Sequence, residues 1–162
     1  MIRRKSIVIN LTQKCNAKCV HCCFECLPNS SNYLTDDEIE KIVSYAESHD
    51  DVKVVSLTGG EALLRKNKVL EIIQRLSLVG KETTLISNAF WATTEAVTER
   101  ILSELKLAGL NYLTISYDDY HAEYILISNV KRLLTIIKKF DIEVALNMVV
   151  DRKHMVLIYL RI

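Results

Sequence analysis

Short runs of β-forming residues alternate with helical patterns along this 162-residue chain, and this alternation limits its fold more than any other feature. Strands are predicted at residues 6–11, 52–57, 83–86, 112–116 and 142–149. Apolar residues at helical spacing lie between them, and the later strands start about 30 residues apart, the length of a βαβ unit. The sequence therefore predicts an α/β fold with a parallel sheet, although periodicity alone does not distinguish a barrel from an open, doubly wound sheet.

Local signals mark the ends of the predicted helices. Thr35 and Glu38 have the spacing of a capping box, in which side chains satisfy free backbone N–H groups at a helix start. Gly80 and Gly109 each follow a helical pattern and precede a strand, where a left-handed helix end favours glycine. These signals support the division of the chain into βα units.

One interval between strands is longer than the rest and contains all five cysteines. About 40 residues separate the first two strands. The part of this interval that precedes the helical pattern is residues 12–34, which we call the cysteine loop. In parallel α/β folds, functional sites gather on the loops at the carboxyl ends of the strands. The cysteine loop directly follows the first strand, so it is predicted to carry the function.

Composition and charge narrow the classes of function. The length suits a single domain, and 21 basic against 20 acidic residues leave a net charge of +1, which predicts neither nucleic-acid nor membrane binding. No stretch approaches the roughly 18–20 apolar residues of a membrane span, and the apolar run at 7–11 is too short for a signal peptide. We therefore expect a cytoplasmic protein, in which clustered thiols bind metal more often than they form disulfides.

Cys15, Cys19 and Cys22 form a C-x3-C-x2-C pattern. Thiolates are soft ligands that suit iron–sulfur clusters and zinc. A structural zinc ion needs four ligands, and the fourth could come from Cys23, Cys26 or His21. Zinc ribbons use a second C-x2-C pair farther along the chain, which this sequence lacks. The pattern favours an iron–sulfur cluster, with zinc and reactive or buried thiols as the alternatives.

These cysteines after a first strand, followed by Gly59-Gly60-Glu61 after the second, resemble the radical S-adenosylmethionine (SAM) superfamily over residues 6–150. The resemblance implies that Cys15, Cys19 and Cys22 bind three irons of a [4Fe-4S] cluster and leave the fourth iron for SAM. It also implies reductive cleavage of SAM to a 5′-deoxyadenosyl radical that abstracts hydrogen. The implied fold is an incomplete parallel (β/α)6 partial barrel, with about five βα units present.

The resemblance also implies a set of residues that contact SAM, one group on each loop. Phe24 would lie near adenine, the segment 58–61 near the amino group, and Ser116 and Asp118 near the ribose or carboxylate. Asn88 could either contact SAM or satisfy a local turn. The full implied set is Phe24, Thr58, Gly59, Gly60, Glu61, Asn88, Ser116, Asp118 and Asn147.

The sequence does not identify a catalytic residue as clearly as it identifies the cluster ligands. Cys23 and Cys26 are candidates for donating a hydrogen atom to a substrate radical, and packing in the loop is the alternative. His121 is a further candidate site residue. Met148, next to Asn147 on the fifth predicted strand, is better explained by packing.

Two functions from different classes follow. The first is a radical SAM enzyme of the peptide-modifying type, which would take a small-molecule cofactor, a peptide substrate and an electron donor such as flavodoxin or ferredoxin. The second is a zinc- or iron–sulfur-binding module without turnover, as in an inactive or regulatory relative. The iron, sulfide and zinc content of the protein would distinguish them.

The end of the chain bears on whether it can act alone. Residues 1–162 are predicted to form a single radical SAM core domain whose fifth strand ends near Val150. Residues 151–162 are too few for a further βα unit of about 30 residues. We expect the sixth unit and any C-terminal extension to be missing, with poor turnover as the result. Alternatively, the tail forms a short extra strand at the sheet edge.

Overall fold

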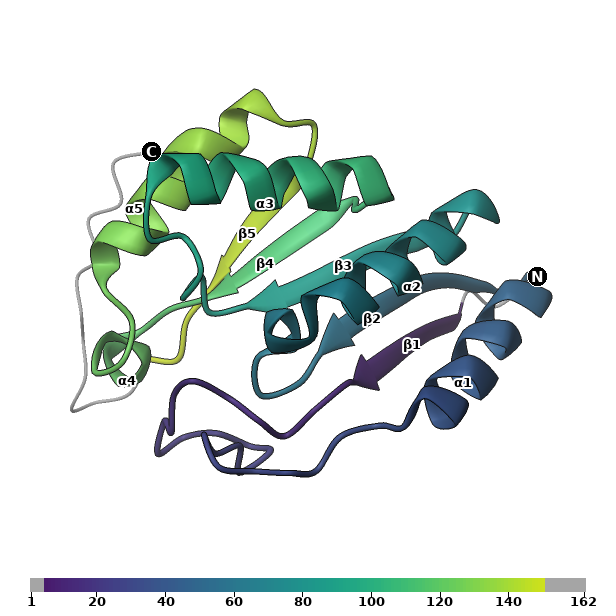
Figure 1. Ribbon diagram of the computed structural model, residues 1–162, viewed down its shortest axis with the longest axis horizontal. Helices are drawn as coiled ribbons and strands as arrows, with labels where there is room; N and C mark the ends of the chain where they lie inside the picture. Colours follow the sequence, from purple (N-terminus) through teal and green to yellow (C-terminus); the bar gives the residue numbers. More distant parts are fainter. Residues whose placement is uncertain (1–4, 151–162) are drawn as a thin grey trace.

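A computed structural model of the protein describes residues 5–150 and contains one five-stranded sheet. All four strand pairings are parallel, and the strands lie in the order of the sequence (Figure 1). The strands are β1 (Lys5–Asn10), β2 (Val52–Thr58), β3 (Glu82–Ser87), β4 (Tyr112–Ser116) and β5 (Glu143–Asn147). The predicted parallel α/β fold is confirmed. The expectation for the tail at 151–162 lies outside the described residues.

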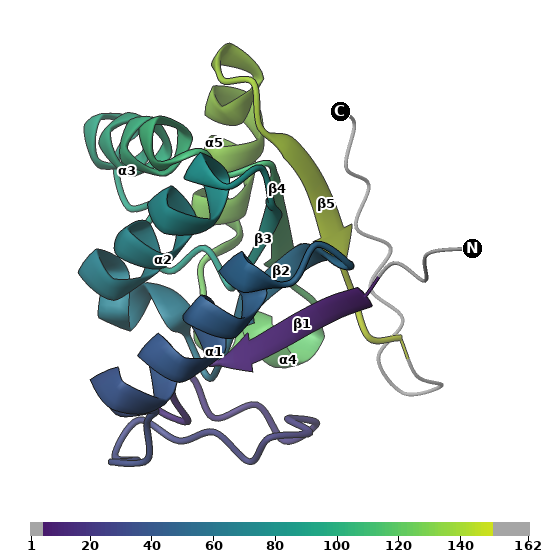
Figure 2. The ribbon, with the colours of Figure 1, turned by 90° about the vertical axis from the view of Figure 1, so that its right-hand side faces the viewer.

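The strand order resolves the choice that periodicity left open. Right-handed crossovers place every helix on the same face when each new strand is added on the same side, whereas a doubly wound sheet reverses direction. The helices α1 (Asp36–Ser48), α2 (Lys66–Leu78), α3 (Glu95–Ala108) and α5 (Ile127–Ile136) cover one face of the curved sheet (Figure 2). This arrangement is a partial barrel, as the resemblance implied.

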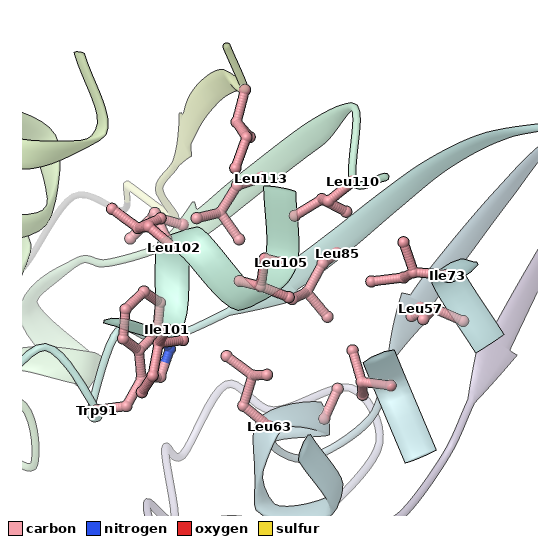
Figure 3. Packing of buried hydrophobic residues seen from close by; sticks show 14 of the residues in the cluster. Leu57, Leu63, Ile73, Leu85, Trp91, Ile101, Leu102, Leu105, Leu110 and Leu113 are labelled. Carbon is pink, nitrogen blue, oxygen red and sulfur yellow. The ribbon is translucent and has the colours of Figure 1, made fainter. Parts of the chain in front are cut away.

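The hydrophobic core lies between the sheet and its helices. Leu57, Leu85 and Leu113 are paired in register on β2, β3 and β4, and all three are fully buried. Side chains from the helices pack onto this row, among them Ile73 and Leu105 (Figure 3). The strand residues that point to the other face are less buried. Only one face of the sheet is therefore covered within residues 5–150.

The helix ends agree with the signals in the sequence. The Thr35 hydroxyl accepts a hydrogen bond from the Glu38 N–H, and the Glu38 carboxylate accepts one from the Thr35 N–H at 2.8 Å. Gly109 ends α3 in the left-handed region with φ 101°, and Gly80 follows α2 with φ 71°. The predicted capping box and both glycine helix ends are confirmed.

Three short elements complete the fold, and the fifth strand ends earlier than predicted. They are the 3₁₀ helices η1 (Ala62–Arg65) and η2 (Ile137–Lys139) and the helix α4 (Asp119–Ala122). The fifth strand was expected at 142–149 but ends at Asn147, the partner of Ser116 in the last register pair. Beyond it, the Val149 N–H donates to the Asp118 side chain at 3.1 Å. The predicted strand was too long because the Val149 N–H bonds the Asp118 side chain instead of a neighbouring strand.

Candidate functional site

A pocket of about 380 Å³ lies at the carboxyl ends of the strands, between the cysteine loop and the loops that follow β2 to β5. This volume is within the usual range for small-molecule sites. The pocket is lined by 20 residues, and most of the residues predicted from the sequence are among them: Cys15, Cys19, Cys22, Cys23, Phe24, Cys26, Thr58, Gly59, Gly60, Asn88, Ser116, Asp118, His121 and Asn147. Met148, which the sequence assigned to packing, also lines it. Folding thus brings five separate segments to one place.

The first part of the cysteine loop is held by backbone hydrogen bonds that continue the β1–β2 pairing. The Gly60 N–H donates to the Thr12 carbonyl at 2.6 Å, and the Glu61 N–H donates to the Lys14 carbonyl at 3.0 Å. The Cys15 N–H donates in turn to the Leu27 carbonyl at 3.2 Å. Cys15 therefore lies at the end of a backbone ladder, which fixes its position.

Gly59 and Gly60 allow the cysteine loop to approach this closely. A Cβ atom at Gly59 would lie 2.7 Å from the Thr12 carbonyl oxygen, and one at Gly60 would lie 2.7 Å from the Lys14 carbonyl carbon and 2.9 Å from the Cys15 Cβ. Atoms in folded proteins do not come this close, so either side chain would displace the loop. The glycines therefore let the backbone of the cysteine loop come close, and they also line the pocket. Their contact with the SAM amino group stays a prediction.

The three cysteines of the motif face the pocket, and burial favours the neutral thiol at two of them. Burial raises the pKa of Cys15, and it raises the pKa of Cys19 to about 11. The Cys15 Sγ accepts a hydrogen bond from the Ala17 N–H, and the Cys22 Sγ accepts one from the Cys26 N–H, each at 3.4 Å. A bound metal centre would supply the positive charge that keeps such thiols deprotonated.

The spacing of possible metal ligands bears on the zinc alternative. Within residues 5–150, one group of three His, Cys, Asp or Glu ligand atoms lies within 4.8 Å, and it consists of His21, Asp118 and His121. Sulfur atoms on one tetrahedral zinc ion lie about 3.8 Å apart, given a Zn–S distance of about 2.3 Å. Among the described residues, Cys15, Cys19 and Cys22 do not form a group of this kind, so zinc and an iron–sulfur cluster both stay open on ligand spacing alone.

Cys23 and Cys26 differ in exposure. Cys23 is exposed, whereas Cys26 is 3% exposed, and burial raises the pKa of Cys26 to about 12. The Cys26 thiol donates to the Phe24 carbonyl at 3.8 Å. Phe24 itself is 44% exposed at the mouth of the pocket. The packing role fits Cys26, and hydrogen-atom donation by either thiol stays a prediction.

Glu61 lies behind the pocket wall rather than in it. Its carboxylate accepts hydrogen bonds from the Leu63 N–H at 3.1 Å and the Asn88 N–H at 2.8 Å. Burial raises the pKa of Glu61 to about 7. Glu61 was predicted to contact SAM, but among the described residues its partners are those that order the start of η1 and the turn after β3. A direct contact with SAM stays a prediction.

Asn88 both stabilises the turn and faces the pocket. Its Oδ1 accepts a hydrogen bond from the Phe90 N–H at 3.1 Å, which is the turn role that the sequence allowed. Its Nδ2 donates to the Asn16 side chain at 3.0 Å and lies 3.9 Å from the Cys15 Sγ. The residue thus connects the loop after β3 to the cysteine loop.

Asp118 joins three loops on the far side of the pocket. Its Oδ1 accepts hydrogen bonds from the His121 backbone N–H and ring Nδ1, at 3.0 and 2.7 Å, and its Oδ2 lies 3.5 Å from the His21 Nε2. Burial opposes the ionised form of Asp118, but the donors from His121 and Val149 outweigh it and lower its pKa. If SAM contacts Asp118, as predicted, it would bind a carboxylate that these protein groups also contact.

The sequence did not predict the part that His21 plays. His21 was considered only as a fourth zinc ligand, yet its ring lies 4.5 Å from the Tyr120 ring and 5.2 Å from the His121 ring. Its Nδ1 atom is buried and has no hydrogen-bond partner within the described chain. The available signal was its position between Cys19 and Cys22, which places it in the pocket with the cysteines.

Comparison with known proteins identifies the family. The family model of the radical SAM superfamily matches residues 9–154. The chain belongs to this superfamily. It is 34% identical over 152 residues to YydG of Bacillus subtilis, a protein named for peptide biosynthesis, covering 93% of this chain and 48% of that protein. It is 38% identical over 150 residues to a Pyrococcus horikoshii protein named as a GTP 3′,8-cyclase, covering 88% and 46%.

Solved structures share the fold at low sequence identity. The structure of anSMEcpe with bound AdoMet and the Cp18Cys peptide matches with a TM-score of 0.60 at 20% identity, covering 87% of this chain and 42% of that chain. Methylornithine synthase (PylB) matches with a TM-score of 0.59 at 16% identity, covering 88% and 43%. The chain thus spans about half the length of the relatives it matches. No helix within residues 5–150 is long and apolar enough to cross a membrane.

Proposed function

We propose that this chain carries the SAM-cleaving site of a radical SAM enzyme, with Cys15, Cys19 and Cys22 holding three irons of a [4Fe-4S] cluster. One observation supports this most strongly: the three thiols of one loop converge on a pocket at the carboxyl ends of a partial barrel. Three thiolates leave one iron open, whereas four would saturate the cluster. SAM bound there would supply, after taking up one electron through the cluster and releasing methionine, the radical chemistry that abstracts hydrogen from a substrate.

The protein's own residues would bind and orient SAM. Thr58, Ser116 and Asn147 line the pocket opposite the cysteines and offer hydroxyl and amide groups to the polar parts of the cofactor. The buried His21 Nδ1, which has no partner within the described chain, could receive one from a polar ligand. This donor set fits a cofactor with amino, carboxylate and hydroxyl groups.

For the substrate, we propose a peptide. The support is the identity to YydG, which is named for peptide biosynthesis, over 93% of this chain. A relative named as a GTP 3′,8-cyclase has comparable identity, so a nucleotide is the competing substrate class. An electron donor of the flavodoxin or ferredoxin type would supply the reducing electron. The second candidate function, a binding module without turnover, predicts a metal centre but no SAM cleavage.

Anaerobic reconstitution tests the function. The protein is incubated with iron and sulfide, then with SAM and a strong reductant, and 5′-deoxyadenosine is measured by chromatography. The proposal predicts about four irons and four sulfides per chain and production of 5′-deoxyadenosine that Cys15→Ala abolishes. A cluster without 5′-deoxyadenosine would favour the binding module, and a single tightly bound zinc ion would contradict the cluster.

A further inference from the structure

The Asn88 side chain lies against the first cysteine of the motif, and its orientation is fixed. The Phe90 N–H can only donate, so the Asn88 atom that it contacts at 3.1 Å must be the Oδ1 acceptor. The Nδ2 group then points the other way, to the Asn16 Oδ1 at 3.0 Å and the Cys15 Sγ at 3.9 Å. The hydrogen bonds therefore fix which end of the Asn88 amide faces the Cys15 Sγ.

The backbone of Asn88 is held as firmly as its side chain. Its N–H donates to the buried Glu61 carboxylate at 2.8 Å, and Glu61 also accepts from the Leu63 N–H. Asn88 is itself 5% exposed, and Cys15 is 8% exposed. A donor that is buried and fixed in this way withdraws more negative charge from the sulfur than an exposed donor does, because water competes less for it.

We propose that Asn88 sets the reduction potential of the cluster by donating a hydrogen bond from its Nδ2 to the Cys15 thiolate. This inference rests on the proposed function, since it requires Cys15 to bind the cluster. A donor to a ligating sulfur withdraws negative charge from it, and hydrogen bonds to sulfur are among the features that determine cluster potentials. Reduction adds negative charge to the cluster, so the donor stabilises the reduced form and raises the potential.

Cys15 receives a backbone donor, the Ala17 N–H, and a side-chain donor, the Asn88 Nδ2. The first comes from the backbone and is kept by any side-chain substitution. The second depends on a side chain and can be removed. Asn88 would thus act on electron acceptance by the cluster, in addition to any contact that it makes with SAM.

The test is a redox titration of the reconstituted protein, in which the reduced cluster is followed by electron paramagnetic resonance (EPR) without SAM. Asn88→Ala removes the donor and should lower the midpoint potential. Asn88→Asp keeps the shape and the acceptor for the Phe90 N–H, but it replaces the donor by a negative group and should lower the potential further. Asn32→Ala is the matched control, because Asn32 is an exposed asparagine of the cysteine loop that bonds Gln13.

Cluster content, measured first, separates the two proposals. If the wild-type protein binds no cluster, the proposed function fails. If the wild-type and the variants bind a cluster at equal potential, the assignment of the cluster to Cys15, Cys19 and Cys22 is not affected and the role of Asn88 is wrong. Loss of the cluster from both Asn88 variants, with the control intact, would also overturn the proposal, because Asn88 would then be needed for assembly rather than for tuning.

Discussion

Glu61 is an ionisable residue buried behind the site, and its carboxylate is bound by two backbone N–H groups. Burial raises its pKa from about 4.5 to about 7. The folded chain therefore holds this proton more tightly than the unfolded chain does. The resulting contribution to stability is complete below about pH 4.5 and is lost as the pH rises through about 7.

Glu61→Gln should remove this pH dependence. Urea unfolding of the cluster-free protein between pH 5 and 8 should show a fall in the wild-type free energy of unfolding, on the order of 3 kcal/mol, that the variant lacks. Gln offers one acceptor to the two N–H groups, so the variant should be less stable at pH 5. Parallel pH profiles for the two proteins would contradict the buried, protonated carboxyl.

The cysteines give a second prediction. Alanine at Cys15, Cys19 or Cys22 should abolish binding of iron and sulfide after reconstitution, because each change removes one of three ligands. Cys23→Ala is the matched control, since this neighbouring thiol is exposed, and it should retain the cluster. Cys26→Ala should retain it too, with a loss of stability from the small buried cavity. Equal iron loss from all five substitutions would refute the three-ligand assignment.

Residue identities could be predicted from the sequence where the signal is local. The C-x3-C-x2-C spacing lies within eight residues, and its three thiols do line one pocket. The partners of Glu61 could not be predicted, because Asn88 lies 27 positions away along the chain. The contact of His21 with Asp118 likewise depends on how the β4 loop meets the cysteine loop.

At the scale of elements, the cysteine loop depends on the turn after β2. Gly60→Ala should displace the backbone at Lys14 and Cys15, because its Cβ would overlap both residues. We expect weak cluster binding as well as weak SAM binding. Gly80→Ala is the control, since Gly80 has open space around it and a positive φ. That change should lower stability by about 1–2 kcal/mol and leave iron content unchanged.

The cluster occupancy of Gly60→Ala, compared with its SAM affinity, decides how that experiment is interpreted. A cluster at full occupancy with weakened SAM binding alone would show that the loop tolerates the side chain. The close packing of the glycine against Cys15 would then be unimportant for metal binding. Iron content and SAM affinity should therefore be measured on the same preparation.

Arg65 joins the two ends of the cysteine loop. Its Nη1 donates to the Leu11 carbonyl at 3.0 Å and to the Leu34 carbonyl at 2.8 Å. Arg65→Ala should remove both bonds, at about 1.5–3 kcal/mol each, and speed amide hydrogen exchange across residues 11–35. Arg100→Ala is the control, because Arg100 is exposed and pairs with Glu104 on α3. Unchanged exchange in the Arg65 variant would show that other contacts hold the loop.

Elements with strong periodicity could be predicted, and those set by single side chains could not. The strand predicted at 52–57 is observed at Val52–Thr58, because its apolar pattern is long and continuous. The helix α4 has four residues and begins where the Asp118 side chain accepts the His121 N–H. The same carboxylate receives the Val149 N–H and ends the fifth strand early. One acceptor thus changed two boundaries.

For the whole molecule, the fold class followed from the sequence, but the strand order did not. Alternating strands and helices fit several parallel folds, and the resemblance to a family supplied the partial barrel. The partial barrel now also rests on the structure itself, in which the strands lie in sequence order and the helices cover one face of the sheet (Figure 2). The family fixes the kind of site, whereas the substrate stays a proposal because the chain spans about half of its relatives' length.

The central claim is that three thiols hold a cluster with one open iron, and EPR of the reduced, reconstituted protein with and without SAM tests it most directly. If SAM binds the open iron, its addition should change the g values of the cluster signal, and the change should saturate as SAM is increased. An unchanged spectrum at saturating SAM would contradict the claim, since it would mean that a fourth protein ligand, such as Cys26, occupies the last iron.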